Sequence, residues 1–174
     1  MMKIEDINKV GKIWVYSIRE KGDYGDEQTR VKTLSSERDI PLHPVLVETL
    51  DFISYIQFVQ KKGHERVFHE LPLNFQKNAY HKNVGRFFNE RYLKKVGLKN
   101  SERKLSFHSF RHSVETHLTE KNVNPRYINY LQGHAQDGVG GDVYMKGIPP
   151  EQLLNNCVSK IDWGIDFGLL KVNW

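Results

Sequence analysis

Four side chains in the C-terminal part of the sequence have types and spacing suited to opening a phosphodiester bond. His108 and Arg111 are three residues apart, His134 follows a glycine, and Tyr144 stands ten residues after it. An arginine guanidinium can bind two oxygens of a phosphate at once, and two histidines can donate hydrogen bonds to the same group. A tyrosine phenol can attack phosphorus when nearby cations neutralise the charge of the transition state. The set therefore predicts covalent phosphoryl transfer through Tyr144, with neither a metal ion nor another cofactor.

Each of these residues also has an ordinary structural interpretation. Tyr144 could pack as a buried tyrosine, and Arg111 could pair with Glu115 one turn later on a helix. His108 could be a core or capping histidine, and His134 could simply favour the negative end of a helix dipole. Only the presence of all four in one order favours the catalytic interpretation.

That order resembles the catalytic signature of the tyrosine recombinase (phage integrase) family. The signature is carried by residues 108–111 (His-Ser-Phe-Arg), residues 131–134 (Leu-Gln-Gly-His) and Tyr144. Upstream, residues 31–33 (Val-Lys-Thr) and 38–43 (Arg-Asp-Ile-Pro-Leu-His) are similar to the β-hairpin of that family and its exit. The resemblance covers the chain from about residue 3 to about residue 147.

The resemblance implies a site-specific DNA recombinase that works without a metal ion or ATP. Tyr144 would form a 3′-phosphotyrosyl intermediate with duplex DNA, and Lys32 on the hairpin would protonate the leaving 5′ oxygen. Partners would be duplex DNA and further recombinase subunits, which form a tetramer on DNA in the full-length protein. The site residues implied are Tyr144, Arg111, His108, His134 and Lys32.

The opening of the sequence departs from the family pattern. In the family a first catalytic arginine lies on a helix upstream of a segment such as residues 4–7 (Ile-Glu-Asp-Ile), and the sequence begins too late to include it. The sequence therefore predicts a C-terminal catalytic fragment with little or no turnover alone. The alternative is a DNA-binding or assembly module that has the same fold and no chemistry. A covalent adduct between Tyr144 and DNA is expected only for the catalytic fragment, so it would distinguish the two functions.

Composition sets broad bounds on the protein. The 174 residues suffice for one domain, and 26 Lys and Arg against 21 Asp and Glu give a net charge of +5, which favours a polyanionic partner. The single cysteine, Cys157, excludes an intrachain disulfide and fits a reducing compartment. No apolar run approaches the roughly 18 residues of a membrane helix. We therefore expect a cytoplasmic protein with no membrane partner, and the family resemblance implies that it is bacterial or phage-encoded.

The hydrophobic pattern predicts a mainly helical fold with a small antiparallel β-sheet (α+β), like a tyrosine recombinase catalytic domain. Strands are expected over residues 12–19, 29–33 and 38–42. Helices are expected over residues 44–62, 80–96, 106–121, 125–133, 139–146 and from residue 149 onward. Ser106 is expected to cap the third helix, which carries His108 and Arg111 on one face.

Two further features complete the sequence-based expectations. His108 and His112 have the spacing of a zinc-binding helix pair, but the glutamate of that motif and a third ligand are missing, so a metal site is not favoured. Residues 151–174 follow Tyr144 and carry apolar side chains at helical spacing. In the resembled family such a tail docks on a neighbouring subunit. Packing back onto its own domain is the alternative.

Overall fold

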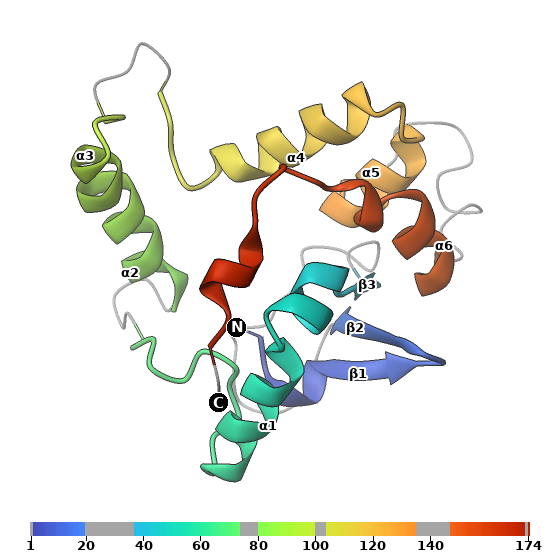
Figure 1. Cartoon of the computed structure of the whole chain (residues 1–174), viewed down its shortest axis with the longest axis horizontal. Helices are drawn as coiled ribbons and strands as arrows, with labels where there is room; N and C mark the ends of the chain where they lie inside the picture. Colours follow the sequence, from blue (N-terminus) through green and yellow to red (C-terminus); the bar gives the residue numbers. More distant parts are fainter. Residues whose placement is uncertain (1, 20–36, 74–79, 100–103, 135–146, 173) are drawn as a thin grey trace.

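A computed structural model describes residues 2–19, 37–73, 80–99, 104–134, 147–172 and 174 of the chain. Its fold is mainly helical with one small antiparallel sheet, as the sequence predicted (Figure 1). None of the helices in these ranges is both long and apolar enough to cross a membrane.

The sheet has three antiparallel strands in the order β1-β2-β3. These are β1 (Ile7–Val10), β2 (Ile13–Ile18) and β3 (Arg38–Pro41). Strands β2 and β3 lie within two predicted ranges, whereas the predicted strand 29–33 lies outside the described residues. Strand β1 was not predicted, because its four residues include Asn8 and Lys9, which are poor strand formers. It pairs with β2 through a turn in which Gly11 has a φ of 62°.

One short helical element, η1, precedes the sheet, and the other helical elements follow it along the chain. They are η1 (Ile4–Asp6), η3 (Val45–Thr49), α1 (Phe52–Lys61), α2 (His81–Arg86), η4 (Phe87–Tyr92), α3 (Leu93–Lys95), α4 (Ser109–Glu120), α5 (Pro125–Gln132), α6 (Pro150–Asn156), η5 (Val158–Lys160) and η6 (Phe167–Leu170). The predicted helix 80–96 is present as α2, η4 and α3 in succession, and the predicted helix 139–146 lies outside the described residues.

Two helix predictions were wrong in detail. The helix expected over residues 44–62 is divided into η3 and α1, because Asp51 adopts a left-handed conformation with a φ of 51°. An aspartate tolerates that conformation better than most residues, and apolar periodicity does not reveal it. Ser106 does not cap α4 with its side chain; its N–H donates instead to Ser109 Oγ at 3.0 Å, and α4 begins at Ser109.

Helix α5 has the ends that its sequence predicts. The side chain of Asn124 accepts a hydrogen bond from the N–H of Arg126 at 2.9 Å, and Pro125 occupies the first helical position. Gly133 ends the helix in the left-handed region, with a φ of 68°. The position of His134 immediately after the helix is therefore set by local sequence.

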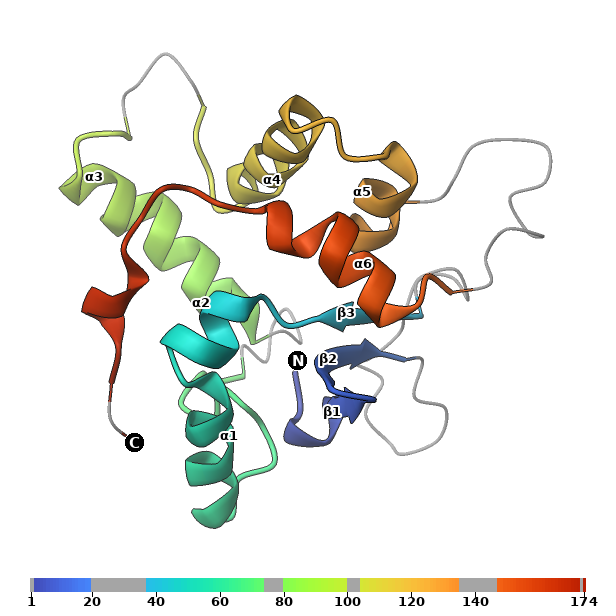
Figure 2. The same cartoon turned by 45° about the vertical axis from the view of Figure 1, so that its right-hand side comes forward.

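Helix α6 lies between the sheet and the pair formed by α4 and α5 (Figure 2). Leu153 on α6 and Cys157, the residue directly after α6, are fully buried. They belong to a core cluster that consists of Leu118, Val123, Ile128, Ile148, Leu153, Cys157 and Val158. A second cluster, of Ile7, Leu42, Ile56 and Val67, joins the sheet to α1. The sheet, α4 and α5 are thus held together through α6.

The segment after α6 runs back over the same domain. His43 Nε2 lies 2.9 Å from the carbonyl oxygen of Ile161, and the N–H of Asp162 donates to His117 Nε2 at 3.2 Å. At the end of the chain the rings of Trp174 and Tyr55 lie 4.5 Å apart. The tail therefore packs extensively on its own domain, while docking on a neighbouring subunit stays a prediction for its exposed apolar side chains.

Candidate active site

Helices α4 and α5 bring two of the sequence motifs together. Arg111 Nη2 donates to the carbonyl oxygen of Gln132 at 2.7 Å, and Gln132 Nε2 donates to the carbonyl oxygen of Arg111 at 3.1 Å. Gln132 is buried, so the exchange fixes the half-buried Arg111 side chain at the C-terminal end of α5. The two hydrogen bonds thus join Arg111 to a residue 21 positions later in the sequence, directly before Gly133 and His134.

Arg38, the first residue of β3, lies at the same end of α5. A Cβ atom placed on Gly133 would lie 2.6 Å from Cζ and Nη1 of Arg38 and 2.7 Å from its Nη2. Because these three distances are nearly equal, the plane of the guanidinium faces Gly133. A side chain at position 133 would therefore displace the guanidinium of Arg38, in addition to adopting an unfavourable positive φ.

The two arginines are close enough to affect each other. Burial lowers the pKa of Arg38 below its ordinary value, and the positive charge of Arg111 lowers it further. An anion placed near both guanidiniums would reverse that unfavourable interaction. The end of α5 is therefore a local centre of positive charge.

Sequence reasoning missed Arg38, although residues 38–43 contributed to the resemblance. The missing information was the direction of its side chain. Successive residues of a strand point to opposite faces of the sheet, so Arg38 shares a face with Ile40, which packs against the core under α5 and α6. That shared face carries Arg38 towards α5.

The histidines lie at the edges of this centre. His108 immediately precedes α4, is exposed, and its carbonyl oxygen accepts the N–H of Arg111 at 3.0 Å. Its ring lies 5.1 Å from that of His112 in an edge-to-face arrangement. His134 is exposed, and its N–H donates to the carbonyl oxygen of Asn129 at 2.9 Å. Both rings are therefore accessible to a ligand in solvent.

Lys32 and Tyr144 lie outside the residues that the structure describes. The expectation that all four signature side chains converge on one concave basic surface therefore stays a prediction. Of the residues around these motifs, the structure joins Arg111 to Gln132, two positions before His134.

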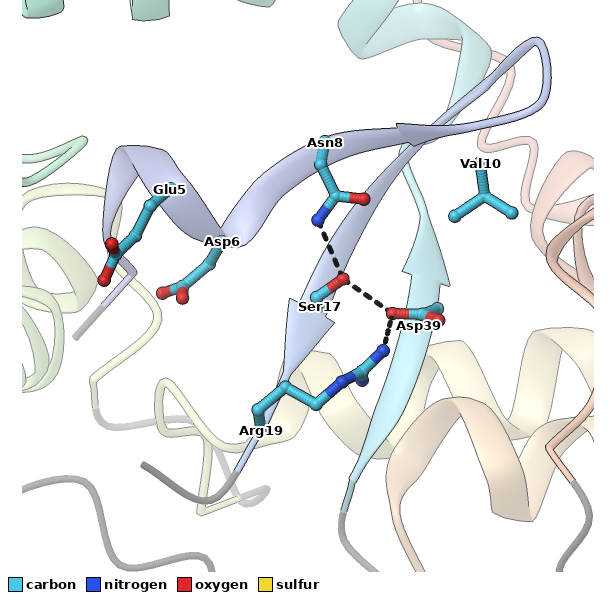
Figure 3. Close-up of a pocket in the computed structure, with 7 residues that line it drawn as sticks. All are labelled: Glu5, Asp6, Asn8, Val10, Ser17, Arg19 and Asp39. Atoms are coloured by element: carbon cyan, nitrogen blue, oxygen red, sulfur yellow. Dashed lines mark hydrogen bonds and ion pairs between the residues drawn. The ribbon is translucent and has the colours of Figure 1, made fainter. Parts of the chain in front are cut away.

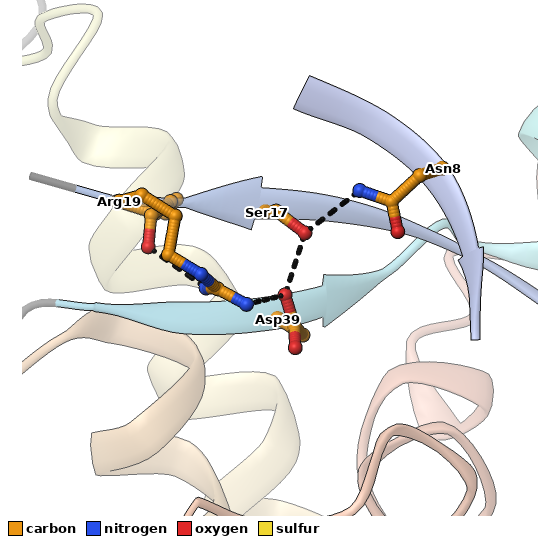
Figure 4. Close-up of polar contacts among 5 residues, drawn as sticks. Asn8, Ser17, Arg19 and Asp39 are labelled. Atoms are coloured by element: carbon orange, nitrogen blue, oxygen red, sulfur yellow. Dashed lines mark hydrogen bonds and ion pairs between the residues drawn. The ribbon is translucent and has the colours of Figure 1, made fainter. Parts of the chain in front are cut away.

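A polar network connects the end of β2 to the start of β3 (Figures 3 and 4). Asn8 Nδ2 donates to Ser17 Oγ at 3.0 Å, and Ser17 Oγ donates to Asp39 Oδ1 at 2.6 Å. Arg19 Nη2 lies 2.6 Å from the same oxygen of Asp39. The network holds the two strand ends at a fixed separation, on the face of β3 opposite to Arg38.

A group of aromatic rings supports the start of α4. The ring of Phe88 lies 5.4 Å from that of Phe107 and 5.3 Å from that of Phe110. The N–H of Phe107 also donates to Asn89 Oδ1 at 2.8 Å. Segment η4 thereby holds the turn that carries His108.

Within the described ranges, no group of three or more His, Cys, Asp or Glu side chains is arranged to hold a metal ion.

The family model described as the phage integrase family matches residues 1–146, which is most of the chain. The chain belongs to the phage integrase family, a class of DNA recombinases. No curated protein and no solved structure matches it.

Proposed function

We propose that this chain forms the catalytic part of a site-specific DNA recombinase in which Tyr144 is the nucleophile. The observation that carries the proposal is the position of Arg111, held by Gln132 beside the glycine that precedes His134. A scissile phosphate at this position would meet the guanidinium of Arg111, and in this proposal the exposed rings of His108 and His134 donate to the same phosphate.

In the proposed reaction the Tyr144 phenol oxygen forms a bond to phosphorus and loses its proton to solvent. The bond from phosphorus to the 5′ oxygen breaks, and Lys32 donates a proton to that oxygen. The product is a 3′-phosphotyrosyl linkage and a free 5′ hydroxyl. A second 5′ hydroxyl can then attack the linkage and restore the phosphodiester, so the exchange consumes no ATP.

The positive centre has a defined part in this step. Charge builds on the non-bridging oxygens of phosphorus in the transition state, and a preorganised guanidinium stabilises it more than it stabilises the ground state. Arg111 is preorganised because its Nη2 is already fixed by Gln132. In the proposed assembly, duplex DNA and other recombinase subunits are the partners.

The experiment uses a duplex nicked close to the scissile phosphate, so that a short leaving strand diffuses away and the covalent product accumulates. Trapping needs only one attack per molecule, so slow turnover does not hide it. We expect a protein–DNA adduct that resists denaturant with the wild-type chain and none with Tyr144→Phe. Tyr127→Phe, a change on helix α5 at a tyrosine with no proposed part in the reaction, serves as the matched control.

A chain that binds the nicked duplex but yields no adduct would favour the alternative function, a DNA-binding or assembly module. An adduct that persists in Tyr144→Phe would place the nucleophile at another residue.

A further inference from the structure

We infer that Tyr130, on helix α5, is a positioning residue for the attack by Tyr144, because its phenol group joins α5 both to β3 and to the chain just after the proposed nucleophile. The inference rests on the proposed function, since it concerns the same reaction. Tyr130 directly precedes the motif of residues 131–134 and belongs to none of the sequence motifs.

The first contact of Tyr130 is with strand β3, which is an edge strand within the described part of the sheet. The N–H of Leu42 donates to the carbonyl oxygen of Trp14 on β2 at 2.8 Å. Hydrogen bonds alternate along an antiparallel pair, so the N–H of Asp39, three residues before Leu42, faces away from β2. A hydrogen bond joins the main chain of Asp39 to the phenol of Tyr130. The outward N–H of the edge strand therefore has a partner on α5.

The residue that Tyr130 contacts on β3 is held from its other side as well. The side chain of Asp39 accepts hydrogen bonds from Ser17 and Arg19, at 2.6 Å in each case. Asp39 is thus bound by β2 through its side chain and by α5 through its main chain. These contacts fix β3 relative to the helix that ends in Gly133 and His134.

The second contact of Tyr130 is with Gly147. A Cβ atom placed on Gly147 would lie 3.3 Å from the phenol oxygen, so the oxygen lies against this glycine. Gly147 comes three residues after Tyr144 in the sequence, and the next residue, Ile148, is buried in the core cluster against which Tyr130 packs. The phenol group therefore contacts the chain between the proposed nucleophile and the core.

These contacts suit a positioning role and not a chemical one. Burial raises the pKa of the Tyr130 phenol above its ordinary value, so the group stays protonated at neutral pH and is a poor nucleophile. Attack on phosphorus depends on how well the nucleophile is aligned, and a displacement of about 1 Å can lower a rate roughly a hundredfold. A group that fixes α5, β3 and Gly147 together can therefore affect the rate without touching the substrate.

The test measures how fast the covalent adduct forms on the nicked duplex, at saturating duplex, in the wild-type chain and in Tyr130→Phe. Phenylalanine keeps the packed ring and removes only the oxygen. We expect the rate to fall by about tenfold or more, with the duplex affinity and the final yield of adduct unchanged. Tyr127→Phe, the same change at a tyrosine of α5 that packs against the same core cluster, should react at the wild-type rate.

A purely structural role of Tyr130 would give a different result. Partial unfolding would lower the melting temperature, the duplex affinity and the yield together, while the folded molecules would still react at the wild-type rate, and the inference would be overturned. An unchanged rate in Tyr130→Phe would also overturn it and leave the proposed function intact. Absence of an adduct with the wild-type chain would contradict the proposed function and the inference together, so the two failures are distinguishable.

Hydrogen exchange of the Asp39 amide, followed by NMR, tests the contact independently of the reaction. This amide should exchange slowly in the wild-type chain and in Tyr127→Phe. It should exchange faster in Tyr130→Phe, because the oxygen that accepts its hydrogen bond is removed. Equal exchange rates in the three proteins would overturn the inference.

Discussion

Arg111 and Gln132 exchange two hydrogen bonds, in which each side chain donates to the main-chain carbonyl oxygen of the other residue. The exchange joins α4 to α5 and uses the otherwise unsatisfied carbonyl at the end of a helix. It explains how a charged side chain can be half-buried and still directed to one place.

The first prediction concerns Gln132. Replacing it with alanine removes the hydrogen bond to the Arg111 carbonyl and leaves a space in a buried position. We expect a loss of roughly 1 to 3 kcal/mol in the free energy of unfolding, measured by chemical denaturation, and weaker DNA binding because the carbonyl oxygen that holds Arg111 is less firmly positioned. Gln152→Ala, at an exposed position of α6, should change neither. Equal effects of the two substitutions would show that the exchange has no special role.

The second prediction concerns Gly133. Alanine at this position must adopt a φ of 68°, which costs about 1 to 2 kcal/mol, and its Cβ would displace the flexible end of Arg38. We expect Gly133→Ala to reduce both stability and DNA affinity. Gly97→Ala is the matched control, since Gly97 has a φ of 74° and open space around a Cβ, so it should lose stability only.

Coupling between the two residues provides an additional check. Arg38→Ala removes the group that the new Cβ meets, so the effects of Gly133→Ala and Arg38→Ala on stability should not add. Strict additivity would mean that the two residues do not constrain each other.

The third prediction concerns pH. Burial raises the pKa of the Cys157 thiol from its ordinary value of 9.0 to about 11. The folded state therefore holds the thiol proton more tightly than the unfolded state, so this contribution to stability is complete below pH 9 and is lost as the pH rises to about 11. Relative to Cys157→Ala, the wild-type chain should lose roughly 2 to 3 kcal/mol of unfolding free energy over that interval.

Denaturation at several pH values measures this difference, and the variant corrects for other groups that titrate in alkali. Parallel stability curves for the two proteins would contradict the assignment. Alkylation of the thiol gives an independent reading, since the buried sulfur should react only when the protein opens.

The fourth prediction concerns the tail. Deleting residues 163–174 removes mostly exposed side chains, so we expect the domain to stay folded, as judged by circular dichroism melting. Deleting residues 151–174 removes the buried Leu153, Cys157 and Val158, so we expect unfolding, because each large buried side chain contributes about 2 to 5 kcal/mol. The burial of these side chains makes α6 and the residues directly after it part of the core of their own domain.

The shorter deletion also tests docking on a neighbouring subunit. The exposed side chains Ile165, Leu169 and Leu170 are available for such a contact. If they dock on another subunit, the shorter deletion should reduce assembly on DNA, measured by sedimentation, without lowering the melting temperature. Unfolding after the shorter deletion would instead make the whole tail a structural part of its own domain.

The fifth prediction concerns DNA binding by the wild-type chain. We expect weak binding to duplex DNA with little sequence preference, and an affinity that falls linearly with salt concentration on logarithmic axes. Competition with unrelated duplexes measures the preference, and fluorescence anisotropy measures the affinity. Strong discrimination between unrelated sequences would show that base contacts, and not phosphates alone, determine the binding.

The sequence by itself determined the family, the fold class and the ends of α5. These depend on short-range information: the order of the His-x-x-Arg and Gly-His motifs, the strong β pattern of β2, and the caps Asn124 and Gly133. A cap acts through hydrogen bonds between neighbouring residues and through local φ and ψ values, so it can be read without knowledge of the rest of the fold.

Only the tertiary structure decided which side chains meet. Arg38 and Gly133 are far apart in the sequence, and nothing local to either indicates that a guanidinium lies against that glycine. The break at Asp51 and the core position of α6 were likewise invisible to periodicity, because one residue with a positive φ leaves the apolar pattern unchanged and a short apolar helix can pack on any available surface. Contacts of this kind depend on how the sheet, α5 and α6 pack together, and that packing is a property of the whole chain.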